Sequence, residues 1–172
     1  MSDDNLKPSD RLYYAIAALP GWDEVSEQAR NLGESYAWRF GRILSSVLVA
    51  AGEDREPLAV TGVLNRQEAG NLAIIYDQFI VLVDVVTLSE QNGGTTVTVH
   101  GFGAIDELQI STTHNYFDGT SQQMRHQGIE LKIQIAGHEF VFPPTRWARG
   151  PLLQGDAALQ AYTTIRDHRA GR

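Results

Sequence analysis

The feature that most constrains the fold is a succession of short apolar runs between residues 57 and 143. The runs are rich in Val, Ile, Thr, Leu and Phe, and Gly, Asn or Asp residues stand between most of them. β-Branched and aromatic side chains favour strands, and Gly and Asn accept the positive φ angles of tight hairpins. We therefore predict an antiparallel meander of seven strands, at residues 57–64, 71–76, 79–88, 95–100, 104–114, 128–136 and 138–143.

Helices are predicted on both sides of the meander. Before it, Ser9 can cap a short helix over residues 10–19, which the following Pro-Gly pair would end. One long amphipathic helix is then predicted up to Gly52, because apolar side chains recur every three or four residues, although Gly33 weakens it by about 1 kcal/mol. Its apolar stripe consists of Val25, Ala29, Leu32, Tyr36, Phe40, Leu44, Val47 and Ala51. After the meander, Asp156 can cap a final helix.

These elements place the chain in the α+β class. We expect two bent sheets that form a sandwich or a partly open barrel, with the C-terminal helix capping one end. The pattern changes from helix to strand near residue 52, which divides the chain into an N-terminal helical segment, residues 1–51, and a β domain with the last helix, residues 52–172. A chain of 172 residues buries roughly 70% of the surface that it would expose unfolded, so it needs no disulfide, and it has no cysteine.

Composition limits the partners and the compartment. The formal net charge of −7 argues against nucleic acid, because affinity for phosphates comes mainly from Lys and Arg. The polar start, MSDDNLKPSD, lacks the basic and apolar parts of a secretory signal, and no run approaches the ~18 apolar residues of a membrane span. We therefore expect a cytoplasmic protein. Without cysteine there is no thiolate zinc site and no nucleophilic thiol, and we expect neither a metal nor a cofactor.

Motifs for catalysis or metal binding are weak. The Gly-x-Gly of HGFGAID, residues 100–106, lacks the third glycine of a dinucleotide fingerprint, and a bend or bulge in a strand is the ordinary explanation for it. None of the five histidines has the i, i+4 partner of a helical zinc site. His114 and His126 could approach each other with Asp118 as a third ligand, but solvated loop residues are the simpler interpretation. No catalytic residue is predicted, and a binding module is favoured over an enzyme.

The segment PPTRWARGP, residues 143–151, carries the candidate binding residues. Its two leading prolines end the last predicted strand and hold the chain behind them extended. Arg146, Trp147 and Arg149 would then be presented from a stiff loop, and Trp and Arg are enriched at binding hot spots. Alternatively, Trp147 folds back and closes one end of the strand layer, with the arginines paired to acidic groups. The sequence leaves both interpretations open.

Four stretches precede the final helix in a recognisable order: LSSVLVAAGEDREPLAVTGVL, GNLAIIYDQFIVLVDV, GAIDELQI and the hairpin GIELKIQIAGHEFVF. In this order, residues 43–168 resemble the pleckstrin-homology-like (PH-like) domain family, particularly its bacterial members. The resemblance implies a scaffold that binds peptides, partner proteins or lipids. The first hairpin, NRQEAGN, offers only Arg66 beside Glu68, so the basic residues that would hold an inositol phosphate are missing. Phosphoinositide binding is therefore not expected.

Three functional hypotheses remain. The first is a non-enzymatic binding or assembly module that recognises a protein or peptide partner, through Arg146, Trp147 and Arg149 or through an open strand edge. The second is a small enzyme or ligand-binding protein with a pocket between the long helix and the sheet, lined for instance by His100, Asp106 or His114. The third is a homo-oligomer that forms through the apolar stripe of residues 25–51.

Overall fold

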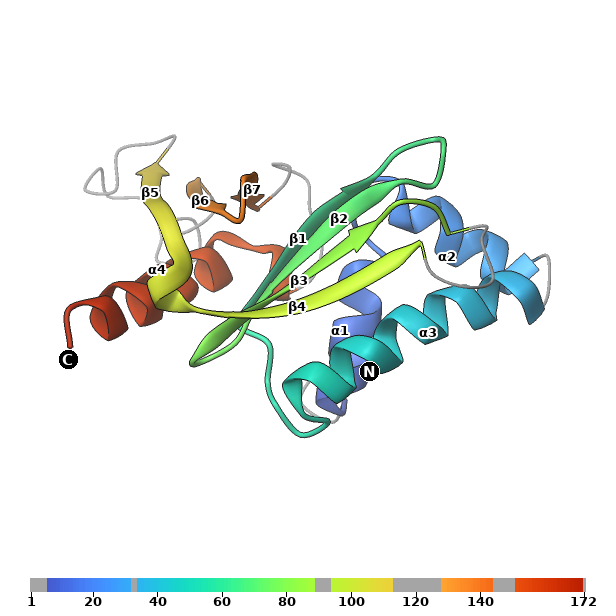
Figure 1. Cartoon of the computed structure of the whole chain (residues 1–172), viewed down its shortest axis with the longest axis horizontal. Helices are drawn as coiled ribbons and strands as arrows, with labels where there is room; N and C mark the ends of the chain where they lie inside the picture. Colours follow the sequence, from blue (N-terminus) through green and yellow to red (C-terminus); the bar gives the residue numbers. More distant parts are fainter. Residues whose placement is uncertain (1–5, 32–33, 89–93, 113–127, 144–150, 172) are drawn as a thin grey trace.

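The computed structural model describes residues 6–31, 34–88, 94–112, 128–143 and 151–171, which contain four α-helices and two antiparallel sheets (Figure 1). The helices are α1 (Pro8–Ile16), α2 (Trp22–Asn31), α3 (Glu34–Ala51) and α4 (Gly155–Arg169). The short 3-10 turns η2 (Phe102–Ala104) and η4 (Pro151–Leu153) follow the first sheet and precede α4, respectively.

The first sheet has the order β1-β2-β3-β4, and the second has the order β5-β6-β7. Their strands are β1 (Ala59–Leu64), β2 (Gly70–Ile75), β3 (Phe79–Val85), β4 (Thr95–Gly101), β5 (Ile105–Thr112), β6 (Ile129–Ile135) and β7 (His138–Phe142). Each strand pairs antiparallel with the next one inside its sheet. The predicted α+β class and the antiparallel meander are thus confirmed, with strand ends within about three residues of the prediction. The described strands do not close a barrel.

The two central strands of the first sheet, β2 and β3, are buried on both faces. Successive side chains of a strand point to opposite sides, so each strand contributes to two cores. One face of β2 and β3 contributes Leu72, Ile74, Val81 and Val83 to a core shared with α1, α2 and α3. The other face contributes Ala73, Ile75, Ile80 and Leu82 to a second core, shared with the second sheet and α4. The two cores lie on either side of one sheet, so this sheet is the central layer of the molecule.

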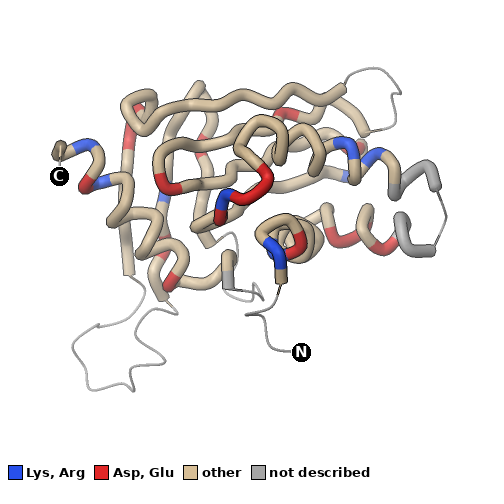
Figure 2. Tube along the Cα trace, turned by 90° about the horizontal axis from the view of Figure 1, so that it is seen from below, with Lys and Arg blue, Asp and Glu red and all other residues tan. Residues whose placement is uncertain are grey.

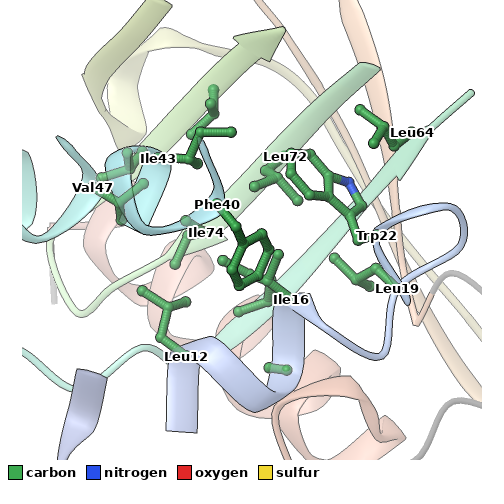
Figure 3. Close-up of a cluster of buried hydrophobic side chains, with 14 of the residues drawn as sticks. Leu12, Ile16, Leu19, Trp22, Phe40, Ile43, Val47, Leu64, Leu72 and Ile74 are labelled. Atoms are coloured by element: carbon green, nitrogen blue, oxygen red, sulfur yellow. The ribbon is translucent and has the colours of Figure 1, made fainter. Parts of the chain in front are cut away.

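The helical layer covers the first face of the sheet (Figures 1 and 3). Trp22, the first residue of α2, and Phe40 of α3 are both buried, with ring centroids 6.2 Å apart. Ile43 and Val47 follow Phe40 on the same buried side of α3. Burying an apolar side chain of this size stabilises the fold by about 1.5–3 kcal/mol, so the helices are an integral part of the first core.

The second core joins the two sheets to the last helix. α4 presents Ala157, Ala158, Ala161 and Ile165 to it, and the three small alanine side chains let the helix pack against β6. Thr61 of β1 is buried and donates a hydrogen bond from Oγ1 to the carbonyl oxygen of Val141 in β7, at 2.6 Å. This bond connects the outer strand of the first sheet to an outer strand of the second.

The single long helix predicted up to Gly52 is wrong. Instead α2 ends at Asn31 and α3 begins at Glu34, and the chain reverses direction between them, so that the two helices lie side by side (Figures 1 and 2). In the sequence, Gly33, which is expected to weaken a helix, lies between the last residue of α2 and the first of α3. Periodicity could not reveal the reversal, because two helices that cover the same face of a sheet carry the same apolar spacing as one.

Two predicted helix caps are also wrong, whereas the helix end at Gly52 is confirmed. α1 begins at Pro8, where proline is well tolerated because the first helical N–H needs no partner, and Ser9 lies inside the helix. α4 begins at Gly155, so Asp156 lies in its first turn. Gly52 follows α3 with φ +97° and donates its N–H to the carbonyl oxygen of Leu48, at 2.8 Å.

Candidate functional site

The predicted contact residues Arg146, Trp147 and Arg149 lie outside the described residues. So do His114, Asp118 and His126, the set considered for a metal. Neither set is tested, and both stay predictions. Within the described part of the chain, no three His, Asp or Glu side chains gather closely enough to share a metal ion. No helix among the same residues is both long and apolar enough to cross a bilayer.

The region between α3 and the first sheet, where a pocket was the alternative prediction, is packed with apolar side chains (Figure 3). The polar residues named for that pocket lie elsewhere: His100 is on β4 and Asp106 is exposed on β5. The ring Nε2 of His100 lies 3.0 Å from Oγ1 of Thr98. Burial raises the pKa of Tyr76 to about 12, so this phenol is protonated at neutral pH and cannot act as a general base there.

The strands that end each sheet form a more informative feature. The sheet orders leave β1 and β4 at the edges of the first sheet and β5 and β7 at the edges of the second. An edge strand carries main-chain N–H and C=O groups that point away from its own sheet, and these groups can pair with a strand of another chain. Proteins usually obstruct such edges with charges, prolines, bulges or neighbouring segments.

Three of the four edges are obstructed in one of these ways. β1 lies beside β7 and is tied to it by the Thr61–Val141 hydrogen bond. β1 in turn covers part of β7, which is also short, with only five residues. β5 starts with an irregular register between Ile105 and Glu107, and Asp106 and Glu107 place carboxylates at this end of the strand. The fourth edge, β4, differs from all three.

The register shows which groups of β4 point outward. Val86 donates its N–H to the carbonyl oxygen of Gly94, so this directly opposed pair is a hydrogen-bonded one. Hydrogen-bonded pairs recur at every second position of an antiparallel ladder, which assigns Thr96, Thr98 and His100 to bonds with β3. The main-chain groups of Val97 and Val99 then point away from β3.

The other side of β3 supports the same assignment. Tyr76 donates its N–H to the carbonyl oxygen of Phe79, at 2.9 Å, which puts the odd-numbered residues of β3 in hydrogen-bonded pairs with β2. The even-numbered residues are thereby left for β4. Among the described residues, none bonds to the outward main-chain groups of Val97 and Val99. We call these groups the β4 edge.

The side chains of β4 leave this edge accessible. The strand, TTVTVHG, contains no Asp, Glu, Lys, Arg or Pro, and in Figure 2 it forms an uncharged upper border of the described chain. Thr96 and Thr98 are exposed, and Val99 exposes 49% of its surface. Val97 is partly buried against the first core. β4 thus combines an inner side that is paired with β3 and an outer edge that is neutral and that no described strand or main-chain group covers.

Comparisons with models of known protein families, with curated proteins and with solved structures found no match to this chain. The sequence predicts an open strand edge without identifying which strand provides it. β1, with the sequence AVTGVL, is as free of charge and proline as β4, so composition alone could not separate the two. The distinction depends on β7, which approaches β1 and not β4.

Proposed function

We propose that this chain is a non-enzymatic binding or assembly module that recognises an extended segment of a protein partner by adding it as a strand at the β4 edge. The observation that carries the proposal is the row of outward N–H and C=O groups at Val97 and Val99, on a strand without charge or proline. The scaffold is of a suitable kind, because β4 is paired along its length with β3, and the two faces of β3 are buried in the two cores, so the strand is ordered before a partner arrives.

A partner strand would gain from two sources. Each main-chain hydrogen bond contributes about 0.5–1.5 kcal/mol net, and the N–H and C=O groups of both valines take part. The half-exposed Val99 side chain would be covered by a β-branched or aromatic neighbour, a pair worth about 0.2–1 kcal/mol. After the cost of association these gains leave room for weak to moderate affinity, with a Kd on the order of micromolar.

The element order adds support from a second direction. Two antiparallel sheets followed by a C-terminal helix are the arrangement that the PH-like resemblance implies, and that family is a scaffold for peptides and partner proteins. We therefore propose a PH-like module whose ligand is a peptide or protein. Arg146, Trp147 and Arg149 remain a predicted second contact surface, and phosphoinositide binding remains unexpected.

Peptide selection tests the proposal with a matched pair of variants. Val99 of β4 and Val63 of β1 are 49% and 50% exposed and stand on the two edges of the same sheet. Peptides selected from a random display library on the immobilised protein should be extended and rich in β-branched residues. Val99→Lys should weaken them at least about tenfold, since an edge lysine obstructs strand addition, and Val63→Lys should change affinity less than about threefold.

Hydrogen exchange supplies the main-chain readout. A bound peptide should slow the exchange of the Val97 and Val99 amides, because their outward N–H groups become hydrogen-bonded. The proposal fails if selection yields no peptide, if the two lysine variants weaken binding equally, or if these two amides exchange at the same rate with and without peptide. Loss of binding in an Arg146→Ala, Trp147→Ala, Arg149→Ala variant alone would instead favour the second contact surface.

A further inference from the structure

We propose that the β4 edge takes the β4 strand of a second copy of this chain, around a two-fold axis that passes beside Thr98. The inference rests on the proposed function, since it names the partner that the edge accepts. The two four-stranded sheets would become one continuous sheet, with both helical layers on the same side of it.

The strand is complementary to itself in this arrangement. Thr98 is the middle residue of Thr95–Gly101, so a two-fold axis beside it lets both strands overlap over their whole length. Val97 of one copy then lies opposite Val99 of the other, and both are residues whose main-chain groups point outward. The outward N–H and C=O groups of one strand therefore meet those of the other in register.

The side chains match as well. Val97 and Val99 face the helical side of the sheet, because they pair with Val83 and Val81 of the first core. Across the axis they form pairs of β-branched residues, each worth about 0.2–1 kcal/mol, and the half-exposed Val99 is covered. On the opposite face Thr98 meets its own copy, and His100 lies opposite Thr96.

Charge is the reason to favour a second copy at this edge. Pairing two copies of one strand doubles the charge along the seam, so self-pairing of β5 would gather Asp106 and Glu107 of both copies at that edge. β4 has no charged residue, so the strands meet without repulsion even though each chain has a formal net charge of −7. The β4 edge therefore pairs with its own copy through the main-chain groups of Val97 and Val99, without bringing charged side chains together.

Single cysteines test the register directly, because the chain has no cysteine of its own. Thr98 and its copy would form a non-hydrogen-bonded pair with Cα atoms about 4.5 Å apart, within the 4.4–6.8 Å range of disulfides. Two copies of Thr96 would be about 13 Å apart, at roughly 3.3 Å per residue along the strand. Under mild oxidation Thr98→Cys should cross-link into dimers at least about tenfold faster than Thr96→Cys, and both positions are exposed.

Molar mass from analytical ultracentrifugation gives the second readout. The wild-type chain should form a concentration-dependent dimer, Val99→Lys should raise its dissociation constant at least about tenfold, and Val49→Lys should leave it within about threefold. Val49 is 84% exposed on the outer side of α3, so it controls for pairing through helices. Circular dichroism confirms that each variant is folded.

Three results would overturn the inference: a wild-type monomer at all concentrations, equal cross-linking of the two cysteine variants, or a dimer that Val49→Lys dissociates and Val99→Lys does not. The first of these is separable from the proposed function, because a monomer whose selected peptides still depend on Val99 retains strand addition and has a different partner. A chain that neither dimerises nor selects such peptides would refute both.

Discussion

Gly21 is the residue at which the helical layer is fixed to the end of the first sheet. It adopts φ +79°, and a Cβ atom there would collide with the carbonyl oxygen of Leu64 at the end of β1. The neighbouring carbonyl of Pro20 accepts a hydrogen bond from the N–H of Leu64, at 3.0 Å. The Pro20-Gly21 pair predicts a turn from the sequence. The contact of this turn with Leu64 of β1 is a tertiary contact that the local sequence does not indicate.

Gly21 must adopt a positive φ angle and must leave room for the backbone of Leu64, and a comparison with Gly137 separates these two effects. Gly137, between β6 and β7, also has φ +79°, and a Cβ there would meet nothing within 4 Å. Gly137→Ala should cost about 1–2 kcal/mol for the left-handed conformation alone. Gly21→Ala should cost about 1–3 kcal/mol more, because the backbone of β1 must move. Urea unfolding of both variants measures the difference, and equal losses would show that the turn yields without strain.

Among the elements, α3 shows how far periodicity carries. The predicted stripe includes Phe40, Val47 and Ala51, and all three are buried against the sheet. The spacing also places Val25 in the core, although it belongs to α2. The stripe therefore predicts correctly that these side chains are buried and incorrectly that one helix carries them, since two helices on the same face of a sheet keep the same apolar spacing. The described members of the stripe pack within their own chain.

Phe40 and Trp38 give the element-scale prediction, because they are aromatic neighbours on α3 with opposite environments. Phe40 is 2% exposed, whereas Trp38 is 55% exposed and lies beneath the guanidinium of Arg42, 5.2 Å from the ring centroid. Phe40→Ala should lower the free energy of unfolding by about 3–5 kcal/mol, the usual cost of a deleted core aromatic. Trp38→Ala should lower it by less than about 1 kcal/mol. A similar loss of unfolding free energy for both variants would contradict the packing of Phe40 between α3 and the first sheet.

The positions of the strands follow from their apolar runs, but the runs do not indicate which strands lie next to one another. Runs such as NLAIIY and FIVLVDV are apolar at consecutive positions because both faces of the sheet are buried. Nothing in such a run records which strand will lie at the edge. Which edge of the first sheet is covered depends on β7 and α4, which follow in the sequence and pack near β1. The open edge at β4 can therefore be identified only from the three-dimensional arrangement.

At the scale of the whole molecule, the first sheet is shared between two cores. The sequence predicts a boundary between residues 51 and 52, and the helices before it supply one of those cores. If residues 1–51 are removed, the apolar side chains of Val60, Leu72, Ile74, Val81 and Val83 lose their cover. The predicted boundary marks where the helical segment ends along the chain. Whether it is also a boundary between independently folding units can be tested by truncating the chain there.

Residues 52–172 alone should fail to fold cooperatively, because an uncovered apolar sheet face of this kind leads to association or partial unfolding. Near-ultraviolet circular dichroism and thermal unfolding of the truncated chain measure this. Addition of residues 1–51 as a separate peptide should restore the cooperative transition, which serves as the control. A truncated chain that unfolds as a cooperative monomer would establish the 51/52 boundary as a true domain boundary.

The sheet that lies between the two cores also determines how freely the sequence can change. Most positions of β2 and β3 face a packed layer, whichever side they point to, so few replacements there preserve volume and polarity together. The outer face of the second sheet, with Gln109, Lys132 and Gln134, and the outer side of α3 carry no such restriction. We therefore expect substitutions to be tolerated mainly in these two outer layers, and the apolar pattern of β2 and β3 to tolerate few of them.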